Sequence, residues 1–233
     1  MTEPIPALFA GYGGFSPRSI PNLALWLDGN DPTTMTFSSG VKISQWNDKS
    51  GLGNNVTQAN ATLQPSYTAN KKNGKGVADF SLLTNPYLQN AAGPIVSQPL
   101  TVFMAAYAGS ATSYFFDATA NSNRLSAAFY ASEVIGIFGG SGPLNSSNTA
   151  FYQAWGTAVM VFNGVTSTIY VNGTSVATGT AGTDTFSTLR IGTRWAADQG
   201  LDGFLGEMGV YSGILSVPNV AAITNYLRTK WNI

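Results

Sequence analysis

The sequence has 233 residues, of which 9% are charged and 44% hydrophobic, and its formal net charge is zero. Cysteine and histidine are absent, which excludes disulfides, thiolate or imidazole metal sites and the Ser-His-Asp triad. Eleven basic residues balance eleven acidic ones, and no apolar run is long enough to span a bilayer. We therefore expect no nucleic-acid partner and no membrane partner.

The first residues differ in composition from the rest of the chain. Prolines and glycines alternate over residues 1–22, which favours extended backbone, and we predict an N-terminal arm there followed by a domain at 23–233. The arm carries Phe9, Tyr12 and Phe15. We expect these aromatic side chains to bind either the chain's own domain or a neighbouring subunit.

From Leu23 onward, short β-type runs alternate with turn residues, which is typical of a sandwich or a barrel. The predicted strands, in chain order, are Leu23–Asp28, Val41–Trp46, Val77–Phe80, Leu100–Tyr107, Tyr114–Asp117, Arg124–Tyr130, Val134–Phe138, Thr157–Asn163, Thr166–Val171, Thr188–Ile191 and Phe204–Tyr211. Leu100–Tyr107 is apolar at both alternating sets of positions, which predicts a strand that is covered on both faces. Asn172-Gly173 predicts a tight hairpin turn, because both residues accept positive φ.

One helix is predicted, at the C-terminal end. Ser216 is a favourable N-cap, and Pro218 suits the first turn. An apolar stripe at helical spacing follows, made of Val220, Ile223, Leu227 and Trp231. We expect this stripe to dock on the edge of the sandwich.

Several blocks of sequence resemble concanavalin A-like, laminin-G-like domains, of the variety common in bacteriophage structural proteins and bacterial surface proteins. The matching blocks, in order, are Leu25–Pro32, Val41–Gly51, Gln64–Tyr67, Val77–Phe80, Ile169–Gly173, Leu189–Gly192, Asp202–Glu207 and Asn225–Trp231. No block matches between residues 81 and 156. The resemblance implies an all-β jelly-roll sandwich of two antiparallel sheets with a short C-terminal helix, and a homotrimer of the kind common among phage appendages.

The resemblance also limits the chemistry that we expect. Glucanases of this fold carry Glu-x-Asp-x-x-Glu on one strand, and that pattern is missing here, with Glu207 the only acid on its strand. Lyases of the fold generally use a histidine, which this chain lacks. We therefore predict no catalytic residues and read Glu207 as a hydrogen-bonded structural residue.

Two kinds of binding site are candidates. Hard oxygen ligands from Asp28, Asp31 and Asp48 would suit Ca²⁺, although Asp beside Gly and Pro is also an ordinary turn former, and we expect no other cofactor. For glycan, the loop between two late strands offers a stacking ring and polar partners, and a weaker second group lies upstream. The candidate glycan residues are Trp195, Asp198 and Gln199 in the loop, with Tyr152 and Trp155 in the second group. The alternative for Trp195 is that it folds back as a lid over the core.

These features predict a non-catalytic virion protein on the surface of a bacteriophage particle, as a head decoration or tail fibre. The arm would tether it to other virion proteins, and the sandwich would contact host glycan. Glu3 and the nearby prolines do not suit a signal peptide, so we expect assembly in the host cytoplasm. Two alternatives stay open: a bacterial surface or secreted carbohydrate-binding module, and a glycan-cleaving enzyme.

Overall fold

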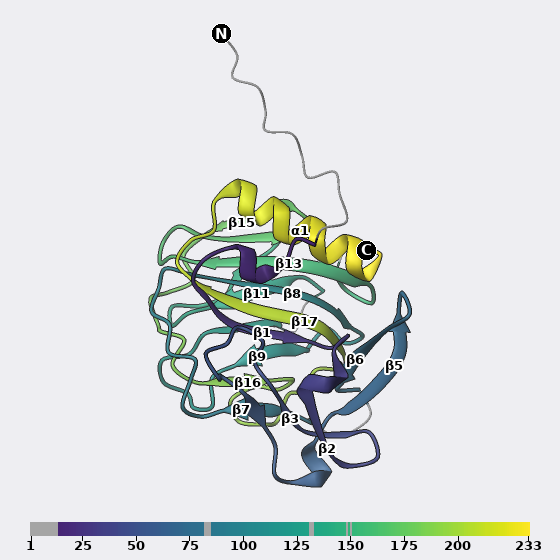
Figure 1. Cartoon of the computed structure of the whole chain (residues 1–233). Helices are drawn as coiled ribbons and strands as arrows, with labels where there is room; N and C mark the ends of the chain where they lie inside the picture. The colour runs from purple at the N-terminus through teal and green to yellow at the C-terminus, as the bar shows by residue number, and fades with distance from the viewer. Residues whose placement is uncertain (1–13, 82–84, 131–132, 148, 150) are drawn as a thin grey trace.

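The computed structural model describes residues 14–81, 85–130, 133–147, 149 and 151–233. It contains two antiparallel β-sheets packed face to face, with one helix on the outside of the sandwich (Figure 1). The predicted all-β sandwich with a short C-terminal helix is therefore confirmed. No helix in these ranges combines the length and hydropathy needed to span a bilayer.

Sheet I is built around the long strands β8 and β17, which pair along their whole length. On the other edge of β17, β1 pairs with one half and β6 with the other. The strands of sheet I are β5 (Ser66–Lys72), β6 (Lys75–Asp79), β1 (Leu23–Asp28), β17 (Gly203–Ser212), β8 (Leu100–Ala108), β13 (Trp155–Phe162), β14 (Ser167–Val171) and β15 (Thr174–Gly179).

Sheet II consists of shorter strands, and a single pairing between Lys42 and Ser66 links it to sheet I. Its strands, in spatial order, are β2 (Met35–Ser39), β3 (Lys42–Trp46), β4 (Val56–Thr57), β7 (Leu88–Asn90), β16 (Leu189–Ile191), β9 (Tyr114–Asp117), β10 (Ser126–Phe129), β11 (Ile135–Phe138) and β12 (Leu144–Asn145). Three single-turn 3₁₀ helices lie in the connections, at Pro17–Ser19, Pro32–Thr34 and Ala61–Leu63.

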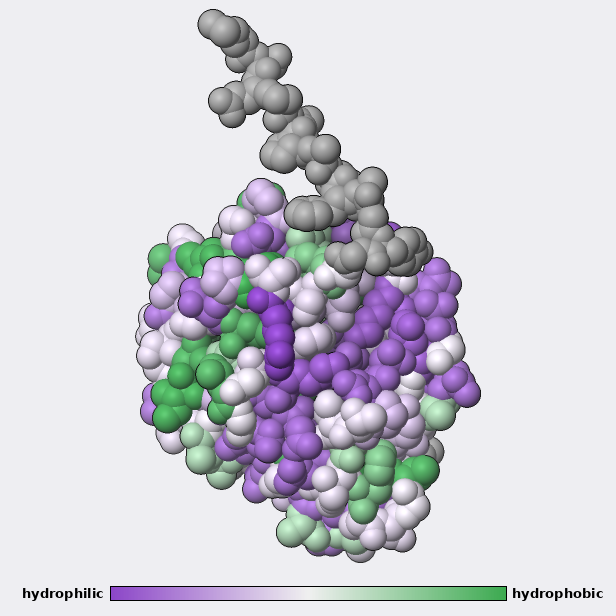
Figure 2. Space-filling model, viewed as in Figure 1, coloured by the Kyte–Doolittle hydropathy of each residue, from purple (hydrophilic) through white to green (hydrophobic). Residues whose placement is uncertain are grey.

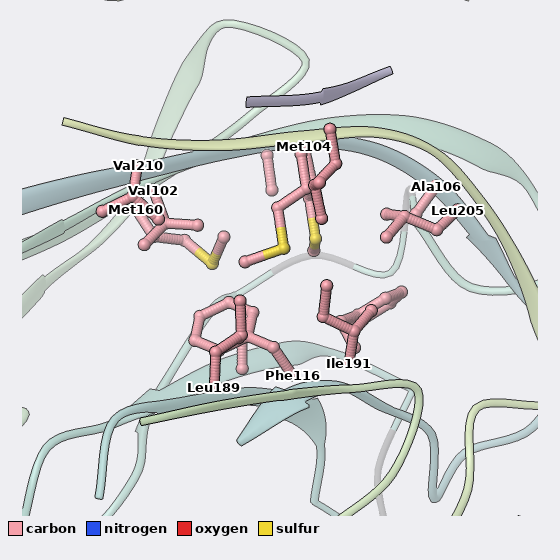
Figure 3. Close-up of a cluster of buried hydrophobic side chains, with 14 of the residues drawn as sticks. Val102, Met104, Ala106, Phe116, Met160, Leu189, Ile191, Leu205 and Val210 are labelled. Atoms are coloured by element: carbon pink, nitrogen blue, oxygen red, sulfur yellow. The ribbon is translucent and has the colours of Figure 1, made fainter. Parts of the chain in front are cut away.

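Side chains from both sheets fill the space between them. Figure 3 shows Met104, Met160 and Leu205 of sheet I directed toward Phe116 and Ile191 of sheet II. All five side chains are at most 1% exposed. Because successive residues of a strand point to opposite faces, the neighbours of these core residues point outward and form the two outer faces of the sandwich.

The helix α1 (Val217–Trp231) lies across the outer face of sheet I, not on an edge of the sandwich as we expected (Figure 1). Its buried stripe packs in one cluster with Phe103 and Ala105 of β8 and Val159 of β13. The reason is that β8 is apolar at successive positions, as predicted, so its outer face also needs cover. Ser216 caps the helix as predicted, its hydroxyl accepting from the Asn219 amide.

The hairpin between β14 and β15 has the predicted turn. Asn172 and Gly173 have φ of 50° and 88°, and Val171 pairs with Thr174 across them. Several strands were not predicted, and β2 and β5 are among them. Most of their residues are polar and partly or fully exposed, so they lack the apolar alternation that marks a strand in sequence.

The described part of the predicted arm packs against the domain. Ile20 is 5% exposed within the cluster beneath α1, and the Tyr211 hydroxyl donates to the Pro17 carbonyl at 2.7 Å. The Phe15 ring lies 5.6 Å from the ring of Tyr226 in α1. The packed domain thus begins before residue 22, while Phe9 and Tyr12 lie outside the described residues.

On the face shown in Figure 2, hydrophilic residues cover a broad central region even though few residues of the chain are charged. Hydrophobic residues gather in separate patches on the face shown. Leu52 and Ile95 are exposed, at 67% and 77%, and line an apolar groove of about 680 Å³ beside the start of β1.

Candidate functional site

The loop between β16 and β17, which the sequence singled out, is a closed structure on sheet II. Thr193 and Gly200 form a bridge at its base, and the Arg194 amide donates to the Gln199 carbonyl at 2.9 Å. The guanidinium of Arg194 holds the Asp198 carboxylate, with Nε 2.7 Å from Oδ1. This hydrogen bond lowers the pKa of Asp198. We call residues 193–200 the site loop.

Trp195 is anchored through its backbone. Its amide donates to Asp117 Oδ2 at 3.1 Å, and its carbonyl accepts from Arg190 Nη1 at 2.5 Å. The indole is half-buried, and the Arg194 guanidinium lies 5.7 Å from the ring centroid. Because both anchors involve main-chain atoms, the position of the loop does not depend on the indole.

Beneath the loop lies a buried ion pair. Asp117, at the end of β9, is fully buried, and Arg124 donates to it from Nε at 3.0 Å and from Nη2 at 2.7 Å. The Ala118 and Trp195 amides complete its hydrogen bonds. Burial alone would lower the pKa of Arg124, but the hydrogen bond and charge of Asp117 raise it on balance. Two-point pairing of this kind fixes both groups rigidly.

Arg190 stands beside this pair on the outer face of sheet II. Its neighbours Leu189 and Ile191 point into the core, so the side chain of Arg190 points outward (Figure 3). Its Nε and Nη2 donate to Gln89 Oε1 at 3.3 and 2.9 Å, and the guanidinium lies 4.5 Å from the Tyr87 ring centroid. Burial lowers its pKa, but a guanidinium stays charged in proteins.

A hollow of about 160 Å³ adjoins the site loop. Gln199, Thr112, Tyr114, Phe129 and Tyr130 line it. The Tyr114 and Tyr130 rings meet edge to face at 5.6 Å, and burial raises the pKa of both phenols. Aromatic rings therefore form much of the wall of the hollow, and Thr112 and Gln199 are polar residues of its lining.

The structure separates the second pair of predicted glycan residues. Tyr152 is half-buried, with its ring 5.9 Å from Phe129, so it lies behind the hollow. Trp155 lies on the outer face of sheet I, stacked on Trp231 at 6.0 Å and on Phe204 at 6.2 Å. The sandwich stands between Trp155 and the site loop, because alternation along β13 turns Trp155 and Val159 to the same outer face.

The three aspartates considered for Ca²⁺ have protein partners. Lys49 Nζ lies 3.1 Å from Asp28 and 2.8 Å from Asp31, so a cation already occupies the space between these carboxylates. Asp48 accepts from four donors, which are the Trp26, Ser50 and Asn54 amides and the Ser50 hydroxyl. In the described ranges, no three acids converge as they would around a metal ion.

Glu207 lies under α1 and is fully buried. Its carboxylate accepts from Trp26 Nε1 at 2.7 Å, the Tyr226 hydroxyl at 2.8 Å, Lys230 Nζ at 2.7 Å and Trp231 Nε1 at 3.1 Å. Lys230 also reaches Asp28 Oδ1 at 2.7 Å. Glu207 thus joins α1 to sheet I, which agrees with the structural role expected from the sequence.

The sequence identified the site loop but not the residues beneath it. We call these residues the platform; they are Tyr87, Gln89, Asp117, Arg124 and Arg190. Asp117 was only the last residue of a predicted strand, and Arg190 was only part of a resembling block. Arg124, Gln89 and Tyr87 carried no signal, because their proximity depends on the lateral order of β7, β16 and β9. The one available signal was Arg190 itself, a charged residue between two apolar residues of a short strand.

The family of this chain follows from comparison with known proteins. The family model described as the concanavalin A-like lectin/glucanases superfamily, of the laminin G type, matches residues 87–221, more than half of the chain. The chain therefore belongs to this superfamily. The match includes residues 87–156, most of the stretch in which no resembling block was found. A sequence search of curated proteins finds no match.

Solved structures with the same fold have low sequence identity to this chain. Domain 4 of AbnA, a GH43 extracellular arabinanase from Geobacillus stearothermophilus in complex with arabinotriose, superposes with a TM-score of 0.61 and 16% identity, covering 87% of this chain and 98% of that one. The binding domain of botulinum neurotoxin DC in complex with rat synaptotagmin II gives a TM-score of 0.56 at 14% identity, covering 88% of this chain and 52% of that one. These likenesses establish the shared fold.

Proposed function

We propose that this chain is a non-catalytic carbohydrate-binding protein displayed on the surface of a bacteriophage particle, as a head decoration or tail fibre. The observation that carries the binding function is the site loop, which presents an aromatic ring and polar side chains on a rigid sheet. Membership of a lectin-type superfamily supports it, and so does the arabinanase domain whose structure includes arabinotriose.

The chemistry of the site suits a sugar. The half-buried indole of Trp195 provides an apolar face for a pyranose or furanose ring, and the exposed Asp198 and Gln199 can hydrogen-bond its hydroxyl groups. The adjoining hollow, with Tyr114 and Tyr130, would receive a second ring or a substituent. Because the loop is pinned by Asp117, binding would require little reordering of the backbone.

The arrangement of acids argues against glycan cleavage. Asp28 and Glu207 approach each other closely enough to share the ammonium of Lys230, as a pair of catalytic carboxylates would. However, Glu207 is sealed beneath α1 and all its hydrogen-bonding capacity is directed to protein donors. A glycan could not reach these two carboxylates, so they favour a binding function over cleavage.

The placement on a virion rests on composition. Few charges and a hydrophilic but nearly neutral surface suit a protein that packs into a large assembly. Phe9 and Tyr12 would contact other virion proteins or the other subunits of a trimer, whereas Phe15 packs on the domain itself. The alternative, a bacterial surface or secreted carbohydrate-binding module, shares the site and differs in location.

Glycan binding is tested with Trp195→Ala on an array of bacterial surface polysaccharides. We expect the variant to lose at least about tenfold in affinity while its melting temperature stays close to that of the wild type, because the loop is anchored by main-chain atoms. Phe37→Ala, which removes an exposed aromatic ring from β2, away from the site loop, is the control and should bind normally. Wild-type protein that binds no glycan would refute the proposed activity.

The location is tested by purifying particles from a host that expresses the chain with its neighbouring genes. Mass spectrometry and cryo-electron microscopy should find the chain on intact particles. Its recovery only from the cell envelope or the culture medium would favour the bacterial module instead.

A further inference from the structure

We infer that the site selects sugars that carry a carboxylate, such as uronic acids, over neutral sugars, and that Arg190 is the residue that recognises the anion. This inference rests on the proposed glycan-binding function and specifies the class of its ligand.

Three arginines gather on this face, and two of them are neutralised. Arg124 pairs with Asp117, and Arg194 pairs with Asp198. Arg190 has no carboxylate within ion-pair distance among the described residues; its hydrogen-bond acceptors are an amide oxygen and main-chain carbonyls. Although Asp117 is its cross-strand partner, both oxygens of that carboxylate are taken by Arg124. The platform therefore carries one uncompensated positive charge.

Arg190 is also fixed in place before any ligand arrives. The ring of Tyr87, the amide of Gln89 and the carbonyl of Trp195 hold the guanidinium on three sides. Nη2 carries two N–H groups, and only one of them has an acceptor in the described ranges. A half-buried cation with a free donor favours an anionic acceptor, because charge-assisted hydrogen bonds are about twice as strong as neutral ones.

The cation and the stacking ring belong to one site. Arg190 donates to the carbonyl of Trp195 itself, so the guanidinium and the indole lie within the span of a short oligosaccharide. A sugar stacked on Trp195 would direct its carboxylate toward Nη2. The neighbouring acid that would repel such a ligand, Asp198, is neutralised by Arg194.

The test uses one oligosaccharide in two forms, with its uronic acid intact and with the carboxyl group reduced to an alcohol. Calorimetry with the whole chain should give about tenfold or greater preference for the acid, which is about 1.4 kcal/mol, because a charge-assisted hydrogen bond is stronger than a neutral one. Arg190→Gln should reduce this ratio to near one while the reduced form still binds. The preference of the wild type should also weaken as salt is added.

Two further variants isolate the charge from the fold. Arg190→Lys keeps the positive charge and should keep a preference for the acid, which would not be expected if Arg190 served only to support the loop. Arg228→Gln makes the same change in net charge at an exposed position on α1 and should leave the ratio unchanged.

The outcomes separate this inference from the function on which it rests. Equal binding of both forms by the wild type, or an unchanged preference in Arg190→Gln, overturns the role of Arg190 and leaves glycan binding intact. If neither form and no other glycan binds, the proposed function itself fails. If Arg190→Gln does not fold, the Arg190→Lys ratio and the salt dependence decide the question.

Discussion

The buried carboxylate of Glu207 is predicted to contribute strongly to the stability of the domain. Replacing it with alanine removes the acceptor for the indole N–H groups of Trp26 and Trp231, neither of which has another partner in the described ranges. Lys230 would keep Asp28 as its counterion, but the Tyr226 hydroxyl, which donates to Glu207 and accepts from Lys230, would also lose its acceptor. The two indoles and the Tyr226 hydroxyl are therefore the donors left unsatisfied.

The expected cost follows from these contacts. Each buried donor that loses its acceptor costs about 1–3 kcal/mol, and breaking a buried ion pair costs about 3–5 kcal/mol. Because Lys230 retains one carboxylate, we expect Glu207→Ala to lower the free energy of unfolding by about 3–5 kcal/mol. For a domain of this length, that corresponds to a fall of about 10 °C in melting temperature.

Urea unfolding followed by tryptophan fluorescence measures this change. Asp202→Ala, which removes an exposed acid just before the same strand, should change the free energy of unfolding by less than about 0.5 kcal/mol. Glu207→Gln should fall between the two, because one oxygen remains but an amide NH₂ then faces N–H donors. A loss below about 1 kcal/mol in Glu207→Ala would refute the role assigned to this carboxylate.

Two further predictions concern the separated aromatic residue and the site loop. Trp155→Ala should lower the free energy of unfolding, measured by calorimetry, by about 3 kcal/mol, because the ring stacks on Trp231 and Phe204. The variant should keep its affinity for glycan. Loss of affinity without loss of stability would show that Trp155 belongs to the binding site. In Arg194→Gln, the pKa of Asp198 measured by carboxyl NMR should rise toward 3.8, since Arg194 is the main cause of its depression. The Arg194–Asp198 pair stabilises the site loop at pH values above the ordinary pKa of aspartate, and this stabilisation is lost as the pH falls through the lowered pKa of Asp198. Arg194→Gln should therefore lack this transition in acid. An unperturbed Asp198 pKa in the wild type would contradict the pairing.

The sequence was informative wherever a local pattern has one structural solution. Leu100–Tyr107 could only be a strand covered on both faces, and Asn172-Gly173 only a tight turn between antiparallel strands. The C-terminal helix was readable from its cap and its stripe. Polar strands such as β2 and β5 were not predicted, because an exposed strand needs no apolar alternation.

The candidate site depended on information that no local pattern contains. Trp195 could be named because its ring offers a stacking face in a loop between two late strands, but the residues beneath the loop come from strands that are distant in sequence. Arg190 lies opposite Gln89 on one side and Asp117 on the other only because β7, β16 and β9 are neighbours in sheet II. The position of Trp155 on the opposite outer face also depends on tertiary structure, because it follows from the place of β13 in sheet I and from the packing of α1.

The amino-acid sequence by itself determined the class of fold, the closing helix and the loop that carries Trp195, because burial periodicity, turn chemistry and helix capping act over a few residues. The tertiary structure alone decided which charges are paired and that, of the three arginines Arg124, Arg190 and Arg194 at the site, Arg190 has no carboxylate partner among the described residues. Whether a charge is compensated depends on groups brought together across strands, and in this protein the paired acids and lysines are structural while Arg190 keeps an uncompensated charge on the outer face.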